Sequence, residues 1–140
     1  PDPFYPLAGA VNAPAPLTPG GPPIFLGGQK PRGIALAARR AAGWLLTGTE
    51  AGNVEYFADR RSAILRALEA ERRDPGTFEI VGQVHTGTDA ASRVTALARA
   101  RAIVAAGATE IIVGIPAALG PAALEDAHRD VLGALRAQFG

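Results

Sequence analysis

Cysteine and methionine are both absent from this chain of 140 residues, and its apolar runs are short. Without cysteine, disulfide bridges and thiolate metal sites are excluded. The apolar runs fall short of the roughly 20 residues that a membrane-spanning helix needs, and no signal-peptide pattern is visible. We therefore expect a cytoplasmic protein without a membrane partner.

Several motifs of catalysis and ligand binding are missing as well. Histidines and carboxylates do not recur at the spacing of metal ligands, so no metal site is expected. The chain has no nucleophile elbow, and Gly27-Gly28 lacks the third glycine of the dinucleotide-binding fingerprint. The 13 arginines alternate with carboxylates, and the net charge is only +1. Because nucleic-acid binders concentrate basic residues on one face, a nucleic-acid partner is not expected.

The first 23 residues differ in composition from the rest of the chain. They hold eight of the 12 prolines, together with Gly9, Gly20 and Gly21. Proline lacks an amide donor and biases the residue before it away from helix. We therefore predict an extended segment or linker over residues 1–23, followed by one α/β domain over residues 24–140.

From residue 24 onward, short apolar runs alternate with helical patterns. Strands are predicted at residues 24–27, 44–47, 78–85 and 109–115. Helices are predicted to begin near Gly33, Asn53, Asp89 and Pro121. This βαβαβαβα order favours a sheet of parallel strands joined by right-handed crossovers.

The first predicted strand runs into a glycine-rich turn, which we predict to be an anion or phosphate site. Glycines have no Cβ atom, so the amides of Gly27 and Gly28 can approach an anion closely. The helix that begins near Gly33 directs unpaired amides and the positive end of its dipole to the same place. The predicted ligand-binding residues of the turn are Gly27, Gly28, Gln29, Lys30, Arg32 and Gly33. The same pattern also fits a tight turn with a solvated basic pair.

His85, at the end of the third predicted strand, is the candidate catalytic residue. Ligands of parallel α/β proteins collect beyond the carboxyl ends of the strands. An imidazole there can act as a general base or as a hydrogen-bond partner of a cofactor. It can also be structural or solvated, and both interpretations stay open.

Four stretches, in their order and spacing, resemble the C-terminal half of luciferase-like monooxygenases. They are residues 23–28, 37–39, 42–46 and 106–113, and the resemblance extends over about residues 22–139. This superfamily includes bacterial luciferase and the coenzyme F420-dependent reductases and dehydrogenases. Many of its members have Asp-Gly-Trp where this chain has Ala42-Gly43-Trp44.

The resemblance implies a parallel (βα)4 half-barrel, corresponding to the second half of a (β/α)8 TIM barrel. It also implies an oxidoreductase, either a monooxygenase or a reductase, that binds FMN or coenzyme F420 and a small organic substrate. The glycine-rich turn would hold the cofactor phosphate, with Thr47 and Gly48 beside the cofactor. Within this class Lys30, Arg32 and Arg39 favour the more anionic F420 tail, and FMN stays open.

A half-barrel would expose two strand edges, which native sheets avoid. Two explanations stay open: the chain is a fragment of a longer enzyme, or it is a natural half-barrel. In the second case it would pair with an N-terminal half-barrel or with a second copy of itself. The alternative function is a non-catalytic half-barrel that binds a phosphate-bearing ligand or acts as an assembly partner.

Overall fold

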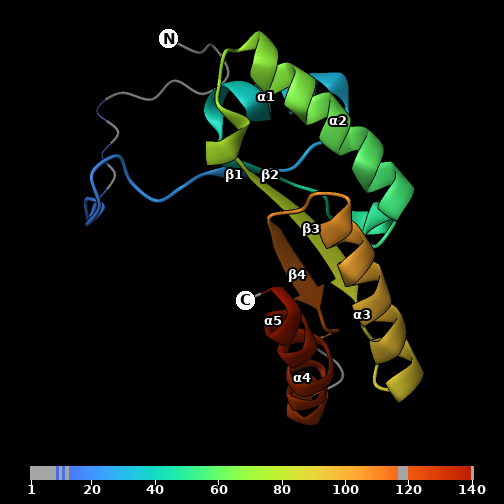
Figure 1. Cartoon of the computed structure of the whole chain (residues 1–140). Coiled ribbons are helices and arrows are strands. Elements are labelled where there is room, and N and C mark those ends of the chain that lie inside the picture. Colours follow the sequence, from blue (N-terminus) through green and yellow to red (C-terminus); the bar gives the residue numbers. More distant parts are fainter. Residues whose placement is uncertain (1–8, 10, 12, 117–119, 140) are drawn as a thin grey trace.

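The computed structural model describes residues 9, 11, 13–116 and 120–139, and strands and helices alternate along them (Figure 1). Within these residues the strands are β1 (Phe25–Leu26), β2 (Gly43–Leu45), β3 (Glu79–His85) and β4 (Glu110–Gly114). The helices are α1 (Pro31–Arg40), α2 (Val54–Ala70), α3 (Ala90–Ala105), α4 (Gly120–Ala127) and α5 (Gly133–Phe139). All strands are parallel, in the order β1-β2-β3-β4. The predicted alternation and the predicted parallel sheet are therefore confirmed.

The helices pack against one another in chain order. Helix α1 contacts α2, α2 contacts α3, and α3 contacts α5, as can be followed in Figure 1. Each crossover returns the chain to the neighbouring strand in the same direction. As a result, the carboxyl ends of all four strands lie along one edge of the sheet.

One face of the sheet packs closely against the helices. Gly82 of β3 lies beside Ile111 of β4, and a Cβ atom on Gly82 would lie only 2.4 Å from Cγ2 of Ile103 on α3. Glycine at this position therefore lets α3 approach the sheet. Because side chains alternate along a strand, His85 and Ile112 lie on the opposite face, and both are exposed.

The hydrophobic core lies between the sheet and the helices. Trp44 of β2 is completely buried and lies 6.4 Å from Phe57 of α2, measured between ring centroids. The largest fully buried side chains are Trp44, Phe57, Leu46, Ile64, Leu68, Ile103, Val84 and Val131. They come from strands and helices along most of the sheet, so the four βα units share one core.

Helix α1 begins earlier than predicted, at Pro31 rather than near Gly33. Proline is favoured in the first helical turn because its missing amide has no partner there in any case. Gly33 consequently lies inside the first turn. The helices α2 and α3 begin as predicted, after Asn53 and Asp89.

The last helical region also differs from the prediction of a single helix. A π-helical turn over His128–Leu132 separates α4 from α5. Buried residues recur every fourth position, at Ala123, Ala127, Val131 and Leu135. In a regular α-helix this spacing rotates each successive side chain by about 40° around the axis. The wider π turn reduces that drift and keeps these residues on one side.

The N-terminal segment carries no helix or strand where it is described. Residues 13–23 run away from the sheet and helices (Figure 1), and Leu17 is fully exposed. The extended segment or linker over residues 1–23 stays a prediction. Residues 1–8, 10 and 12 of the same predicted segment lie outside the described part, and the predicted boundary at residue 23 stays a prediction.

Candidate functional site

The residues predicted to bind a ligand follow two neighbouring strands. Gly27 and Gly28 come directly after β1, and Thr47 and Gly48 come after β2. These two strands pair in parallel, so their carboxyl ends lie about 5 Å apart. The fold therefore brings the two predicted loops together at one edge of the sheet.

A hydrogen bond joins the two loops directly. The side-chain amide Nε2 of Gln29 donates to the carbonyl of Thr47 at 3.1 Å. A second hydrogen bond runs from the indole Nε1 of Trp44 to the carbonyl of Gly28, at 2.9 Å. Trp44 is therefore a core residue that also fixes the glycine-rich turn, as expected for a buried indole N–H, which needs an acceptor.

Two side chains of α2 hold the same turn from the helix side. The hydroxyl of Tyr56 donates to Oε1 of Gln29 at 3.3 Å, and the guanidinium of Arg60 donates to the carbonyl of Gln29 at 3.1 Å. A hydrogen bond with Asp59 keeps the Arg60 guanidinium oriented and raises its pKa. We did not predict Tyr56 and Arg60 from the sequence.

The N-terminus of α1 differs from those of α2 and α3. The side chain of Asn53 accepts from an amide of α2, and the side chain of Asp89 does the same for α3. The N-cap of α1 is Lys30, whose side chain makes no such bond. Helices leave their first amides without partners inside the helix. Pro31 has no N–H group, so the first-turn amides that are available to an anion are those of Arg32 and Gly33.

Gly28 and Gly33 pack closely against each other where the turn meets α1. Gly28 has a positive φ of 111°, a conformation that favours glycine. A Cβ atom on Gly33 would lie 3.1 Å from both the Cα and carbonyl carbon atoms of Gly28. At Gly48, which also has a positive φ, a Cβ would meet nothing within 4 Å. The backbone of α1 and that of the turn are thus in direct contact, whereas Gly48 borders open space.

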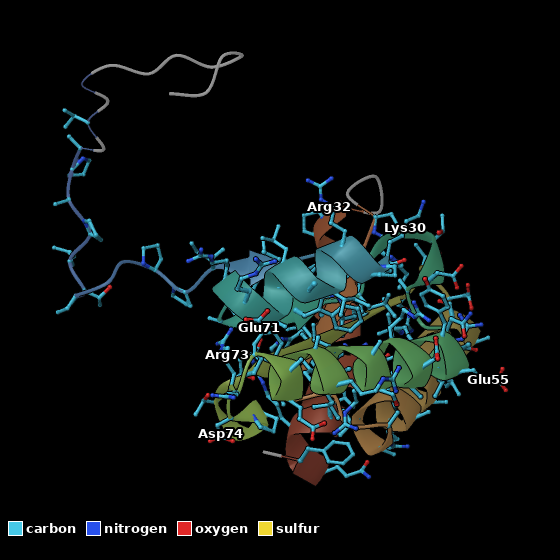
Figure 2. All side chains as sticks on the ribbon, turned by 90° about the horizontal axis from the view of Figure 1, so that it is seen from above. Lys30, Arg32, Glu55, Glu71, Arg73 and Asp74 are labelled. Carbon is cyan, nitrogen blue, oxygen red and sulfur yellow. The ribbon has the colours of Figure 1, made fainter. Side chains whose placement is uncertain are left out.

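Positive charge lies at the same end of α1. Lys30 and Arg32 are both exposed, and Figure 2 places them together at the N-terminal end of the helix. Arg39 does not join them, which corrects its predicted contribution to an anionic ligand. It belongs to the last turn of α1 and lies 3.9 Å from Glu71, which Figure 2 places at the far end. A helix of ten residues is about 15 Å long, which explains the separation.

These donors fit a phosphate group. The turn combines exposed cationic side chains, uncapped helix amides and glycine backbone. Groups of these kinds bind phosphate in proteins. Gln29 is the exception among the predicted ligands, because its side chain already bonds to Thr47 and Tyr56.

His85 ends β3 on the same edge of the sheet, one strand beyond Thr47. Its imidazole lies across Gly114 of β4, where a Cβ atom would come within 2.4 Å of Nδ1. Gly114 therefore leaves the imidazole room to lie over the neighbouring strand. The ring is exposed, so a ligand at this edge can reach it.

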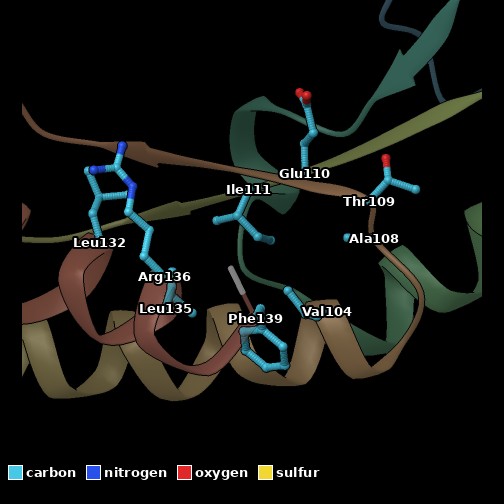
Figure 3. A pocket seen from close by; sticks show the side chains of 9 residues that line it. All are labelled: Val104, Ala108, Thr109, Glu110, Ile111, Leu132, Leu135, Arg136 and Phe139. Atoms are coloured by element: carbon cyan, nitrogen blue, oxygen red, sulfur yellow. The ribbon is translucent and has the colours of Figure 1, made fainter.

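A separate pocket of about 320 Å³ lies at the opposite edge, near the amino end of β4. Val104, Ile111 and Phe139 converge in it, whereas Glu110 points to the other side of the strand (Figure 3). None of the predicted ligand-binding residues lines this pocket.

The described residues also contain no group of three histidine or acidic side chains placed to hold a metal ion. In the same part of the chain, no helix has the length and apolar character to cross a membrane.

A search among curated proteins gave no significant match, but a comparison with solved structures agrees with this architecture. Among solved structures, the chain is similar to the coenzyme F420-dependent tetrahydromethanopterin reductase from Methanopyrus kandleri, with a TM-score of 0.65 and 13% sequence identity. The match covers 80% of this chain and 50% of the reductase.

The chain thus spans about half the length of that reductase. At this low identity the likeness establishes the fold, a parallel α/β half-barrel that corresponds to half of a luciferase-like TIM barrel. The family model of luciferase-like monooxygenases matches residues 3–138, nearly the whole sequence. The chain belongs to the luciferase-like monooxygenase family.

Proposed function

We propose that this chain is the cofactor-phosphate-binding part of a flavin- or F420-dependent oxidoreductase. The observation that carries the proposal is the uncapped N-terminus of α1, which lies beside exposed Lys30 and Arg32. Family membership supports the class of cofactor, and the similar reductase is named as F420-dependent. A half-barrel of this family would complete its site with a second half, either an N-terminal half-barrel or another copy.

In this proposal the residues of the two loops have distinct roles. Amides of the turn from Gly27 to Gly33 bind the phosphate, and the side chains of Lys30 and Arg32 neutralise its charge. Thr47 and Gly48 border the cofactor at the next strand. The bound flavin or deazaflavin supplies hydride transfer to or from a small organic substrate. His85, exposed at the third strand end, is the candidate to move a proton there.

The first test compares flavins with and without phosphate. We expect the double variant Lys30→Ala/Arg32→Ala to bind FMN about tenfold more weakly, from roughly 0.7 kcal/mol for each exposed charge pair. Binding of riboflavin, which lacks the phosphate, should not change. Raising the salt concentration should weaken FMN binding in the wild type more than in the variant. Fluorescence titration of the flavin measures all of these affinities.

The double variant Arg39→Ala/Arg40→Ala is the matched control, because it removes the same charge from the other end of α1. It should leave the affinity for FMN unchanged. The same titrations with F420 decide between the two cofactors. A colourless protein that takes up neither FMN nor F420 would refute the proposal and favour the non-catalytic half-barrel.

A further inference from the structure

The glycine-rich turn is held by residues that reach it from outside. Trp44 bonds to the carbonyl of Gly28, and Arg60 bonds to the carbonyl of Gln29. Tyr56 bonds to the side chain of Gln29, which in turn bonds across to the β2 loop. We call Gln29, Tyr56 and Arg60 the Gln29 network.

All of these contacts use carbonyl groups or the side chain of Gln29. Within the described part of the chain, the backbone N–H groups of Gly28, Gln29 and Lys30 donate to no protein atom. The turn is therefore fixed through its acceptors and leaves its donors available. An anion accepts hydrogen bonds and cannot donate them, so a site that binds one needs free N–H donors.

Tyr56 and Arg60 also contact each other and a neighbouring side chain of α2. Tyr56 and Arg60 are one turn apart on α2, and the Arg60 guanidinium lies 5.5 Å from the centre of the Tyr56 ring. The Nε atom of Arg60 also donates to Asp59 at 2.9 Å. Both side chains are partly buried. Helix α2 thus offers the turn a preformed support.

We propose that Tyr56 and Arg60 are positioning residues, which hold the turn in its phosphate-binding conformation through Gln29. Gln29 then supports the site as a connector between α2, the turn and the β2 loop, while the backbone amides bind the phosphate. This inference rests on the proposed function. A turn that is ordered before the ligand arrives loses less conformational entropy on binding, so the network increases affinity for the phosphate group.

The test uses substitutions that weaken the hydrogen bonds to Gln29 and keep the shape or the charge of the side chain. Tyr56→Phe keeps the aromatic ring but loses the hydroxyl that bonds to Gln29. Arg60→Lys keeps the positive charge but loses the planar fork that bonds to two acceptors. We expect Tyr56→Phe to bind FMN about fivefold more weakly, the effect of one neutral hydrogen bond. Arg60→Lys should weaken FMN binding at least as much, because its bond to the turn comes from a charged guanidinium. Riboflavin affinity should change less than twofold.

Arg66→Lys, an exposed position on the same helix, is the matched control and should leave both affinities unchanged. Phosphate-bearing F420 and its phosphate-free deazaflavin form the corresponding pair if the protein prefers F420. Equal losses for both members of a pair would overturn the positioning role, because a general loss of structure does not discriminate for phosphate. A wild-type protein that binds neither cofactor would overturn the proposed function and this inference with it.

Discussion

At the scale of single residues, the helices contain two glycines with different roles. The structure requires glycine at Gly33, whereas at Gly133 glycine only lowers helix propensity. A Cβ atom on Gly133 would lie 3.5 Å from the His128 carbonyl, an ordinary contact, whereas one on Gly33 would lie 3.1 Å from two backbone atoms of Gly28. Backbone atoms cannot rotate aside as a side chain can. Gly33 therefore keeps α1 and the turn in close contact, and Gly133 has no such role.

We expect Gly133→Ala to raise the free energy of unfolding by about 0.5–1 kcal/mol, because alanine favours helix over glycine. Gly33→Ala should give no such gain and should weaken FMN binding, because the turn must shift to make room. Urea denaturation and flavin titration measure the two effects. Equal stabilisation by both substitutions, with FMN affinity intact, would show that the close contact at Gly33 is unimportant.

Residue types singled out the glycine-rich turn as a candidate site, but they did not indicate which residues hold it in place. Gly27, Gly28, Lys30 and Arg32 could be proposed because glycine and positive charge next to a helix start have a direct chemical meaning. Tyr56 lies 27 positions from Gln29 along the chain, and no local pattern links the two. Only the packing of α2 beside α1 brings them together.

At the scale of elements, Arg93 of α3 forms ion pairs with α4 and with the π turn that follows it. Its side chain is only 12% exposed and lies 2.7 Å from Asp130 and 3.8 Å from Asp126. Arg129 also bonds to Asp130. The hydrogen bonds from Arg129 and then Arg93 lower the pKa of Asp130 below its usual value. The charged form of Asp130 is therefore the one that stabilises this contact.

A lowered pKa in the folded state sets the direction of the pH dependence. The contribution of Asp130 is present above its unfolded pKa of about 3.9 and is lost as the pH falls through the lower folded pKa. We expect the free energy of unfolding to decrease on acidification from about pH 5 to pH 3. Urea denaturation at a series of pH values measures the decrease.

Asp130→Asn should lower stability at neutral pH and make this acid dependence shallower. Glu125→Gln, at an exposed position on α4, is the control and should keep the wild-type profile. An unchanged pH profile in Asp130→Asn would mean that the ion cluster does not stabilise the contact between α3 and the last helices.

The order of the elements followed from periodicity, but some of their limits did not. Strand β1 has only two residues, because it pairs with β2 only at Phe25 and Leu26. The π turn at His128–Leu132 depends on which side of the last helix is buried. Such boundaries are set by contacts between elements, which a linear pattern does not contain.

At the scale of the whole molecule, the described sheet ends in β1 and β4, each paired on one side only. Ile24, beside β1, is 61% exposed, and Ile112 of β4 is 42% exposed. Unpaired strand edges with apolar side chains tend to associate with other chains. This supports the proposal that a second half-barrel completes the molecule.

We expect a protein made of these 140 residues alone to associate, with a mass in light scattering above the 14.3 kDa of one chain. Ile112→Lys should shift the distribution towards monomer, because a charge on β4 opposes edge pairing. Leu17→Lys, in the exposed N-terminal segment, is the control and should not change it. A stable monomer that unfolds cooperatively would contradict this prediction.

The sequence by itself determined the parallel βα order, the family and the chemical character of the turn, because each depends on residue types at short spacing. The tertiary structure decided which residues support that turn and where the charges gather. Arg32 and Arg39 are both on α1, yet only Arg32 lies beside the candidate turn. Contacts across the chain, such as Tyr56 with Gln29, arise from helix packing on a shared core, and packing depends on all of the elements at once.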